Sequence, residues 1–114
     1  VLDNPSGYGR IVRGEGGIIR KIVEDKDSSA DEKKIREINT GIYCARSGFL
    51  YEAVAQIRNE NAQGEYYLTD IVGIAGRSGL RACASVAGDF REVLGINTVE
   101  ELSAAEAILR ERGE

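Results

Sequence analysis

Three short stretches of the chain place glycine and amide residues next to apolar runs, and these stretches hold the residues that could do chemistry. They are residues 7–10, 37–41 and 94–98. Each borders a run that we expect to form a strand, and open α/β sheets bind ligands at the ends of their strands. We therefore expect one ligand site assembled from segments that are far apart in the sequence.

Two residues in these stretches suit a polar ligand such as a sugar. Gly9 would let a hydroxyl or carbonyl group approach backbone N–H groups because no Cβ stands in the way. A glycine here could also serve only the turn. Asn39 offers a donor and an acceptor, which matches sugar hydroxyls, although it could equally form a local turn before a strand.

Two further residues could serve a ligand or a metal ion. Glu24 closes an apolar strand and could accept a hydrogen bond from a sugar hydroxyl or an amide, or could simply be solvated. Asn97 could give an oxygen ligand to Mg²⁺. It also lies just before Thr98, so it could belong only to the start of a helix.

The charge and composition exclude several classes of function. A net charge of −4 and a pI near 5.0 argue against nucleic acid or an anionic membrane as the main partner. No apolar run approaches a membrane span and no secretion signal opens the chain, so we expect a cytoplasmic protein. The absence of histidine removes every His-dependent triad. We expect Cys44 and Cys83 to be small apolar residues in strands.

The elements that would position these residues alternate along the chain. A hairpin is expected from two β-rich runs around a glycine turn at residues 14–17. Strands are expected at residues 10–13, 18–24, 39–45, 81–86 and 92–94. Helices are expected at residues 29–36, 48–59 and 68–75 and from Thr98 to the end of the chain. Strands that alternate with helices indicate an α/β fold.

Five motifs, taken in order, resemble the bacterial N-acetylglucosamine-1-phosphate uridyltransferases, a family in which this domain is fused to a left-handed β-helix acetyltransferase. The motifs are LDNPSGYGRI, IVEDKD, INTGIY, NAQGEYYLTD and EVLGINT. The resemblance extends from Val1 to about Ala107. It implies a partial Rossmann-like nucleotidyltransferase sheet with flanking helices.

The resemblance also implies an activity and a set of site residues. The family joins UTP to N-acetylglucosamine 1-phosphate and releases pyrophosphate, with Mg²⁺ required. The sugar phosphate attacks the nucleotide in line, so the protein mainly positions the partners and neutralises charge. The implied sugar-binding residues are Gly9, Glu24, Asn39, Tyr67 and Thr69, and the implied Mg²⁺ ligand is Asn97.

The same resemblance predicts what the chain does alone. The family's glycine-rich nucleotide loop, catalytic lysine and metal-binding aspartate would precede Val1, and the β-helix would follow Glu114. We therefore expect the C-terminal half of a uridyltransferase domain, inactive alone. We also expect it to form a homo-oligomer through exposed sheet edges. The alternatives are a non-catalytic fragment that binds sugar or associates with itself, and a nucleotidyltransferase for another sugar 1-phosphate.

Overall fold

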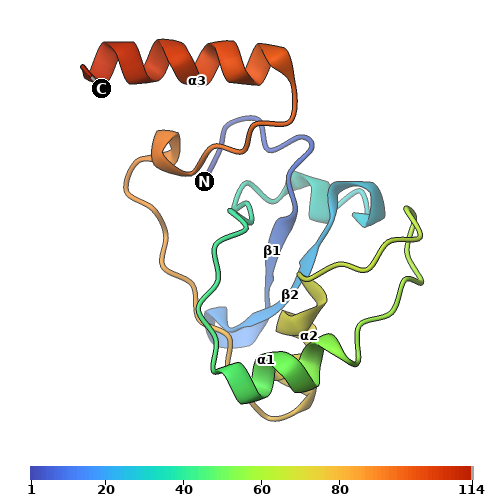
Figure 1. Ribbon diagram of the computed structural model, residues 1–114. Helices are drawn as coiled ribbons and strands as arrows, with labels where there is room; N and C mark the ends of the chain where they lie inside the picture. Colours follow the sequence, from blue (N-terminus) through green and yellow to red (C-terminus); the bar gives the residue numbers. More distant parts are fainter. Residues whose placement is uncertain (114) are drawn as a thin grey trace.

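The computed structural model describes residues 1–113, and its sheet is a two-stranded antiparallel hairpin (Figure 1). β1 (Arg10–Arg13) pairs with β2 (Ile19–Val23) so that Ile11 lies opposite Ile22. The connecting turn includes Gly16 at φ 65°, a conformation that glycine adopts without strain. The predicted hairpin is confirmed.

A buried arginine ties the hairpin to the segments that follow it. Arg10 is 2% exposed, and its guanidinium forms an ion pair with Asp25 at 3.0 Å. It also donates hydrogen bonds to the carbonyl oxygens of Ile35, at 3.1 Å, and of Tyr8. A single antiparallel bridge joins Arg10 to Ile38. Because a buried charge is costly unless it is paired, these contacts fix where the chain returns to the start of β1.

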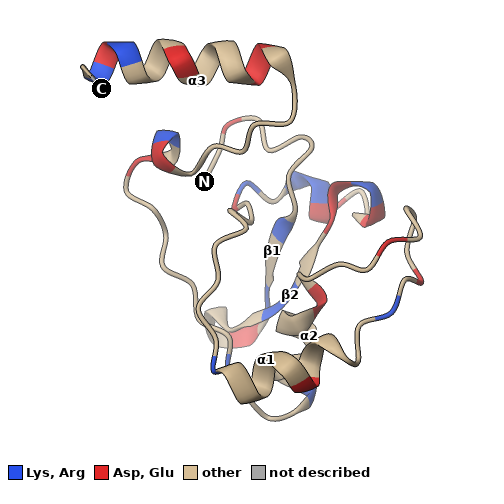
Figure 2. Ribbon diagram, viewed as in Figure 1, with Lys and Arg blue, Asp and Glu red and all other residues tan. Residues whose placement is uncertain are grey.

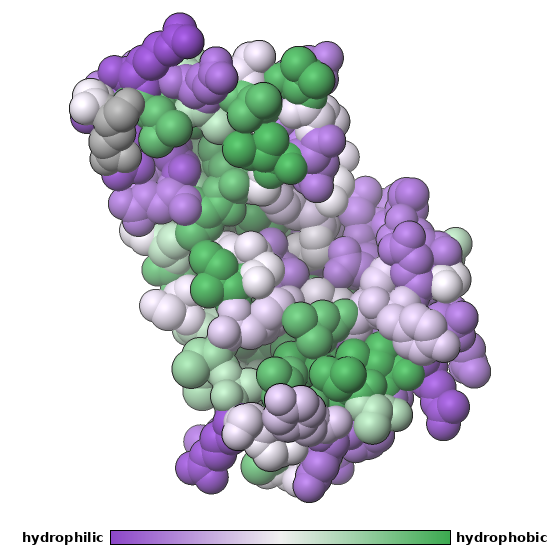
Figure 3. All heavy atoms as spheres, in the orientation of Figure 1, coloured by the Kyte–Doolittle hydropathy of each residue, from purple (hydrophilic) through white to green (hydrophobic). Residues whose placement is uncertain are grey.

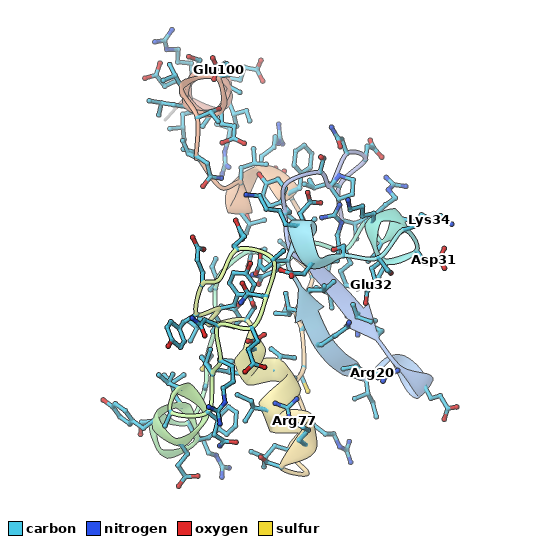
Figure 4. The ribbon with its side chains drawn as sticks, turned by 90° about the vertical axis from the view of Figure 1, so that its right-hand side faces the viewer. Arg20, Asp31, Glu32, Lys34, Arg77 and Glu100 are labelled. Atoms are coloured by element: carbon cyan, nitrogen blue, oxygen red, sulfur yellow. The ribbon has the colours of Figure 1, made fainter. Side chains whose placement is uncertain are left out.

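The polar excursion after β2 forms a short 3-10 turn at Glu32–Lys34, beside the hairpin in Figure 4, and not a helix through residue 36. The predicted Ser29–Glu32 capping pair is present, because each backbone N–H donates to the other side chain. The Lys21 ammonium lies 2.7 Å from the Glu32 carboxylate and holds the pKa of that carboxyl below its usual range. This ion pair fastens the excursion to β2.

Two helices pack together beside the sheet. α1 (Ser47–Val54) and α2 (Asp70–Arg77) bury Ala53, Ile71 and Ile74 between them. α2 also packs against β2, so the helical core and the sheet core adjoin. This arrangement fixes the start of α2 near the end of β2.

The bounds of both helices differ from the prediction. The helix expected at residues 48–59 ends at Val54, where the backbone changes to tighter i+3 hydrogen bonds. The helix expected at residues 68–75 begins two residues later. Leu68, at the start of the predicted range, lies outside the helix and is 48% exposed, whereas Ile74 is 2% exposed in the core.

The strands expected at residues 39–45, 81–86 and 92–94 are absent from the described part of the chain. The first two segments are extended without a strand partner, and the third overlaps a 3-10 turn at Phe90–Val93. A strand needs a neighbour to satisfy its backbone groups, and residues 1–113 place none beside these segments. The chain is thus a small α/β domain, and the Rossmann-like sheet remains a prediction.

Two apolar cavities border these unpaired segments. Their volumes are about 520 and 550 Å³, and Cys44 and Cys83 line both. Figure 3 shows hydrophobic side chains exposed on this face of the molecule. Both cysteines are free and exposed, so the prediction that they lie within strands is wrong. Cys44 and Cys83 are exposed because no neighbouring strand covers the segments that contain them.

The last helix stands apart from both cores (Figure 1). α3 (Val99–Arg112) begins with the predicted capping box, in which Thr98 and Glu101 each accept from the other's backbone N–H. It ends at Gly113 in the left-handed conformation, at φ 75°. No residue of α3 is buried. Figure 2 shows acidic residues in its first turns and basic residues at its end, which complements the helix dipole.

The chain is less compact than its length permits. Its radius of gyration is 15.4 Å, whereas a compact domain of this length would have about 13 Å. The detached α3 and the open cavities account for the difference. None of the helices within residues 1–113 has the length and apolar character required to span a bilayer.

Candidate functional site

The end of β2 and the start of α2 meet at a carboxylate. Glu24 follows the last residue of β2, and its Oε1 accepts a hydrogen bond from the Thr69 hydroxyl at 3.0 Å. Thr69 is 7% exposed and immediately precedes α2. A hydrogen bond to an ionised acceptor that is partly removed from water is stronger than a neutral one. The bond fixes the direction of the Glu24 carboxylate.

Gly9 lies beside this carboxylate. A Cβ built on Gly9 would lie 3.4 Å from Ile22 Cγ2, 3.5 Å from Asn39 Cβ and 3.5 Å from Glu24 Oε1. The Gly9 carbonyl also accepts a hydrogen bond from the Asn39 backbone N–H at 2.8 Å. Gly9, Glu24, Asn39 and Thr69 therefore form one cluster, which we call the Glu24 cluster.

The Asn39 side chain is oriented by two donors. Its Oδ1 accepts from the Tyr43 hydroxyl at 3.0 Å and from the Gly41 backbone N–H at 3.2 Å. A backbone N–H can only donate, so the oxygen must face it and the Nδ2 group must point the other way. Asn39 thus presents two unused donor hydrogens beside the Glu24 carboxylate.

Tyr43 is a residue of this site that the sequence did not single out. Burial raises the pKa of its hydroxyl, the hydrogen bond to Asn39 opposes the shift, and the charge of Glu24 adds to it. The hydroxyl therefore stays protonated and keeps donating to Asn39. The only sequence signal was its position four residues after Asn39, in a segment that we predicted to be a strand.

Tyr67 is held next to the cluster by a neighbouring loop. Its hydroxyl donates to Asp27 Oδ2 at 3.1 Å and accepts from Gln63 Nε2 at 2.8 Å. Burial raises the pKa of this hydroxyl, and the charges of Asp27 and Glu24 contribute to the shift. The other Asp27 oxygen accepts from the Ala62 N–H at 2.7 Å. Asp27 and Gln63 are further residues that no spacing pattern had indicated.

Asn97 lies outside the Glu24 cluster. Its backbone N–H donates to Glu101 Oε2 at 2.6 Å, as part of the start of α3. Its side chain lies near Gly95, which in turn faces the Tyr8 ring next to Gly9. No hydrogen bond in the described residues joins Asn97 to the cluster. The structure therefore brings together four of the six predicted residues, holds Tyr67 beside them and leaves Asn97 to one side.

The described residues do not by themselves fit Mg²⁺. Within residues 1–113, no group of three or more His, Cys, Asp or Glu side chains could hold a metal ion. Asn97 offers one amide oxygen, whereas Mg²⁺ demands near-octahedral oxygen coordination, usually with one or two carboxylates.

The Glu24 cluster meets the apolar cavity of about 520 Å³ at Asn39, which lines that cavity together with its hydrogen-bond donor Tyr43. The rest of that cavity is lined mainly by apolar residues of the hairpin and of the extended segments. The features together define a small α/β chain with an acidic and amide cluster at the end of a two-stranded sheet.

Comparison with known proteins shows which proteins the chain is similar to. The chain is 51% identical over 111 residues to bifunctional protein GlmU of Geobacter metallireducens, covering 97% of the chain and 23% of the relative. Identity is 48% over 112 residues to GlmU of Bacillus velezensis, covering 98% of the chain and 25% of the relative. The chain is 51% identical over 112 residues to GlmU of Brevibacillus brevis, covering 98% of the chain and 24% of the relative.

This identity over nearly the whole chain shows that the sequence is homologous to a segment of bifunctional protein GlmU. The chain spans about a quarter of the length of the curated relatives it matches. No protein-family model matches the chain.

Proposed function

We propose that the chain supplies the sugar-binding side of a uridyltransferase site, which makes UDP-N-acetylglucosamine from UTP and N-acetylglucosamine 1-phosphate. The observation that carries the proposal is the Glu24 cluster. It joins a carboxylate, an amide and an unsubstituted glycine from separate segments. The identity to GlmU supports the choice of reaction. The Rossmann-like sheet and the oxygen ligand from Asn97 to Mg²⁺ belong to the same proposal.

The hydrogen-bonding capacity of the cluster suits an N-acetylated sugar. Glu24 Oε1 is engaged by Thr69, which leaves Oε2 to accept from a sugar hydroxyl or from the acetamido N–H. The Nδ2 group of Asn39 can donate to a sugar oxygen, because its Oδ1 is already occupied. Tyr67 and Thr69 would border the acetamido group. These residues bind and orient the sugar phosphate, and the triphosphate and metal ion would be held by other groups.

Titration of the ¹⁵N-labelled chain with N-acetylglucosamine 1-phosphate tests the proposal. We expect amide shifts concentrated at Gly9, Asn39 and Thr69. Glu24→Gln should weaken binding about tenfold, the effect of losing one charged hydrogen bond. Glu60→Gln is the matched control, since this glutamate is exposed and lies outside the cluster.

Glucose 1-phosphate in the same titration separates the proposal from a nucleotidyltransferase for another sugar. We expect it to bind more weakly, because it lacks the acetamido group that Tyr67 and Thr69 would border. Equal affinity for both sugars would favour the other nucleotidyltransferase. An affinity that Glu24→Gln leaves unchanged would exclude the Glu24 cluster as the sugar site.

A second candidate function is self-association without catalysis. The two cavities beside residues 39–45 and 81–86 expose apolar side chains and backbone groups that lack strand partners. Such edges and apolar surfaces favour pairing with another chain. Sedimentation velocity over a range of concentrations would detect the oligomer, and a monomer at every concentration would exclude it.

A further inference from the structure

A small pocket outside the Glu24 cluster is lined by several basic residues. Its volume is about 270 Å³, and it lies between β2, the turn after α1 and α2. Its charged lining residues are Lys21, Arg58, Asp70 and Arg77. Buried Ile22 and Ile74 contribute to its floor. Three cations thus face one pocket in a chain whose net charge is −4.

Two of these cations lack a close ion pair in the described residues, although the charge of Asp70 is felt by Arg77. Arg58 and Arg77 form no ion pair within residues 1–113, whereas Lys21 is paired with Glu32 at 2.7 Å. The two guanidinium groups come from different elements, one from the turn after α1 and one from the last turn of α2. Figure 4 shows Arg77 on α2, below the hairpin that carries β2. Guanidinium groups are planar, permanently charged donors that match phosphate oxygens.

The Arg77 side chain lies over Gly73. Arg77 Nη1 lies 3.4 Å from where a Cβ on Gly73 would stand, so the arginine runs back along the helix by one turn. Residues four apart share a helix face. The guanidinium therefore lies over Gly73, and both residues line the pocket.

Asp70 is the one carboxylate among the lining residues. Burial raises the pKa of this group, and the positive charge of Arg77 opposes the shift. An anion in the pocket would be repelled by Asp70, and Asp70 and the anion would compete for Arg77. Removing the charge of Asp70 should therefore strengthen anion binding, whereas removing either arginine should weaken it.

We propose that Arg58 and Arg77, with Lys21 beside them, bind a compact phosphoryl anion in this pocket. The size supports a small ligand, because 270 Å³ lies below the range of about 300 to 1,000 Å³ that is typical of sites for drug-sized molecules. The ligand is inorganic phosphate or the phosphate group of a small monoester. The pocket adjoins the Glu24 cluster at Thr69, which also lines the pocket, but neither arginine belongs to that cluster.

Titration of the ¹⁵N-labelled chain with inorganic phosphate, at constant ionic strength, tests the site. We expect shifts centred on Lys21, Arg58 and Gly73, with chloride at equal ionic strength producing none of them. Arg77→Gln and Arg58→Gln should each weaken phosphate binding about tenfold. Arg46→Gln is the matched control, because Arg46 also lacks an ion pair in the described residues but lines a different cavity. Methyl phosphate in a parallel titration distinguishes free phosphate from a monoester.

Two further variants keep the test sharp. Asp70→Asn should tighten phosphate binding several-fold, because it removes the competing charge. Gly73→Ala should leave phosphate binding little changed, because the added Cβ would lie at a contact distance of 3.4 Å from the flexible end of Arg77. The proposal is overturned if phosphate shifts follow ionic strength alone. It is also overturned if Arg46→Gln weakens binding as much as Arg77→Gln in chains whose spectra show an intact fold.

Discussion

At the scale of single residues, Glu24 connects the most parts of the candidate site. Its carboxylate accepts from Thr69, lies beside Gly9 and contributes to the pKa shifts of two tyrosine hydroxyls, those of Tyr43 and Tyr67. None of these contacts buries the whole carboxylate, so one oxygen stays available. A side chain held firmly at one oxygen and open at the other is suited to orienting a ligand.

Gly9→Ala tests whether the space above this glycine is used for binding. The added Cβ would sit at ordinary contact distances of 3.4 to 3.5 Å from its neighbours, so the fold can accept it. We expect the free energy of unfolding to change by no more than about 1 kcal/mol. Affinity for N-acetylglucosamine 1-phosphate should fall more than tenfold, because the methyl group occupies the approach to Glu24 and Asn39.

Urea unfolding and ligand titration of the same samples measure the two effects. Gly88→Ala is the matched control, since a Cβ on Gly88 would meet no atom within 4 Å and this glycine lies outside the cluster. Unchanged affinity in Gly9→Ala would show that the ligand does not approach there.

Asp89 provides a pH prediction that a single substitution can reverse. Its carboxylate accepts from the Arg91 side chain and backbone, which lowers its pKa from 3.8 to about 2. Because the folded-state pKa is depressed, the stabilisation by this pair is complete above 3.8 and is lost as the pH falls toward about 2. Arg91→Gln should return the pKa toward 3.8. Carboxyl ¹³C NMR would measure it, and an unaltered titration would exclude Arg91 as the cause.

At the scale of elements, the sequence predicted those whose partners are close in the chain. The hairpin, the Ser29–Glu32 pair and the start of α3 all depend on contacts within a few residues, and all are present. The strands expected at residues 39–45 and 81–86 depend on partners that local sequence does not specify. Apolar residues do alternate in these segments. Alternation indicates which side chains share one face of a strand, but it does not specify the strand that pairs with it.

The candidate site shows the same division. Glycine and amide residues next to apolar runs were recognisable, because few packing roles require them there. Asp27 was not, because its contacts with Ala62 and Tyr67 join segments far apart in the sequence. Tyr43 and Gln63 bond to residues only four positions away, but nothing in the local pattern distinguishes them from other polar residues. Resemblance to a family supplied Tyr67 and Thr69, which no local pattern had indicated.

Thr98→Ala tests whether α3 is an independent element. The substitution removes the capping hydrogen bond to the Glu101 N–H and should cost about 1 kcal/mol. Because no α3 residue is buried, that loss should appear as fraying of α3 and not as global unfolding. Amide hydrogen exchange should speed up in α3 and stay unchanged in α2. Ser103→Ala, on the exposed helix surface, is the control, and faster exchange in α2 would show that the two helices are coupled.

At the scale of the whole molecule, residues 1–113 contain two small cores and two open apolar cavities. The cores share one side of the hairpin, where Ile11, Ile19 and Ile22 meet Val72 of α2. The cavities lie along segments that have the composition of strands but no strand neighbour. Two of the exposed large hydrophobic residues, Ile42 and Val86, lie in these segments. The homo-oligomer formed through sheet edges stays a prediction.

Val86→Glu tests whether this surface drives self-association. Val86 is 58% exposed and lines the cavity of about 520 Å³, so a charge there would have to be desolvated when a second chain covers the cavity. We expect sedimentation velocity to show the unmodified chain shifting from monomer to dimer as concentration rises, and the variant to remain monomeric over that range. Val99→Glu is the control, because Val99 is 74% exposed on α3 and lines none of the cavities described above. Equal loss of the dimer in both variants would show that added negative charge, and not the cavity surface, prevents association. A dimer that persists in Val86→Glu would place the contact on another face.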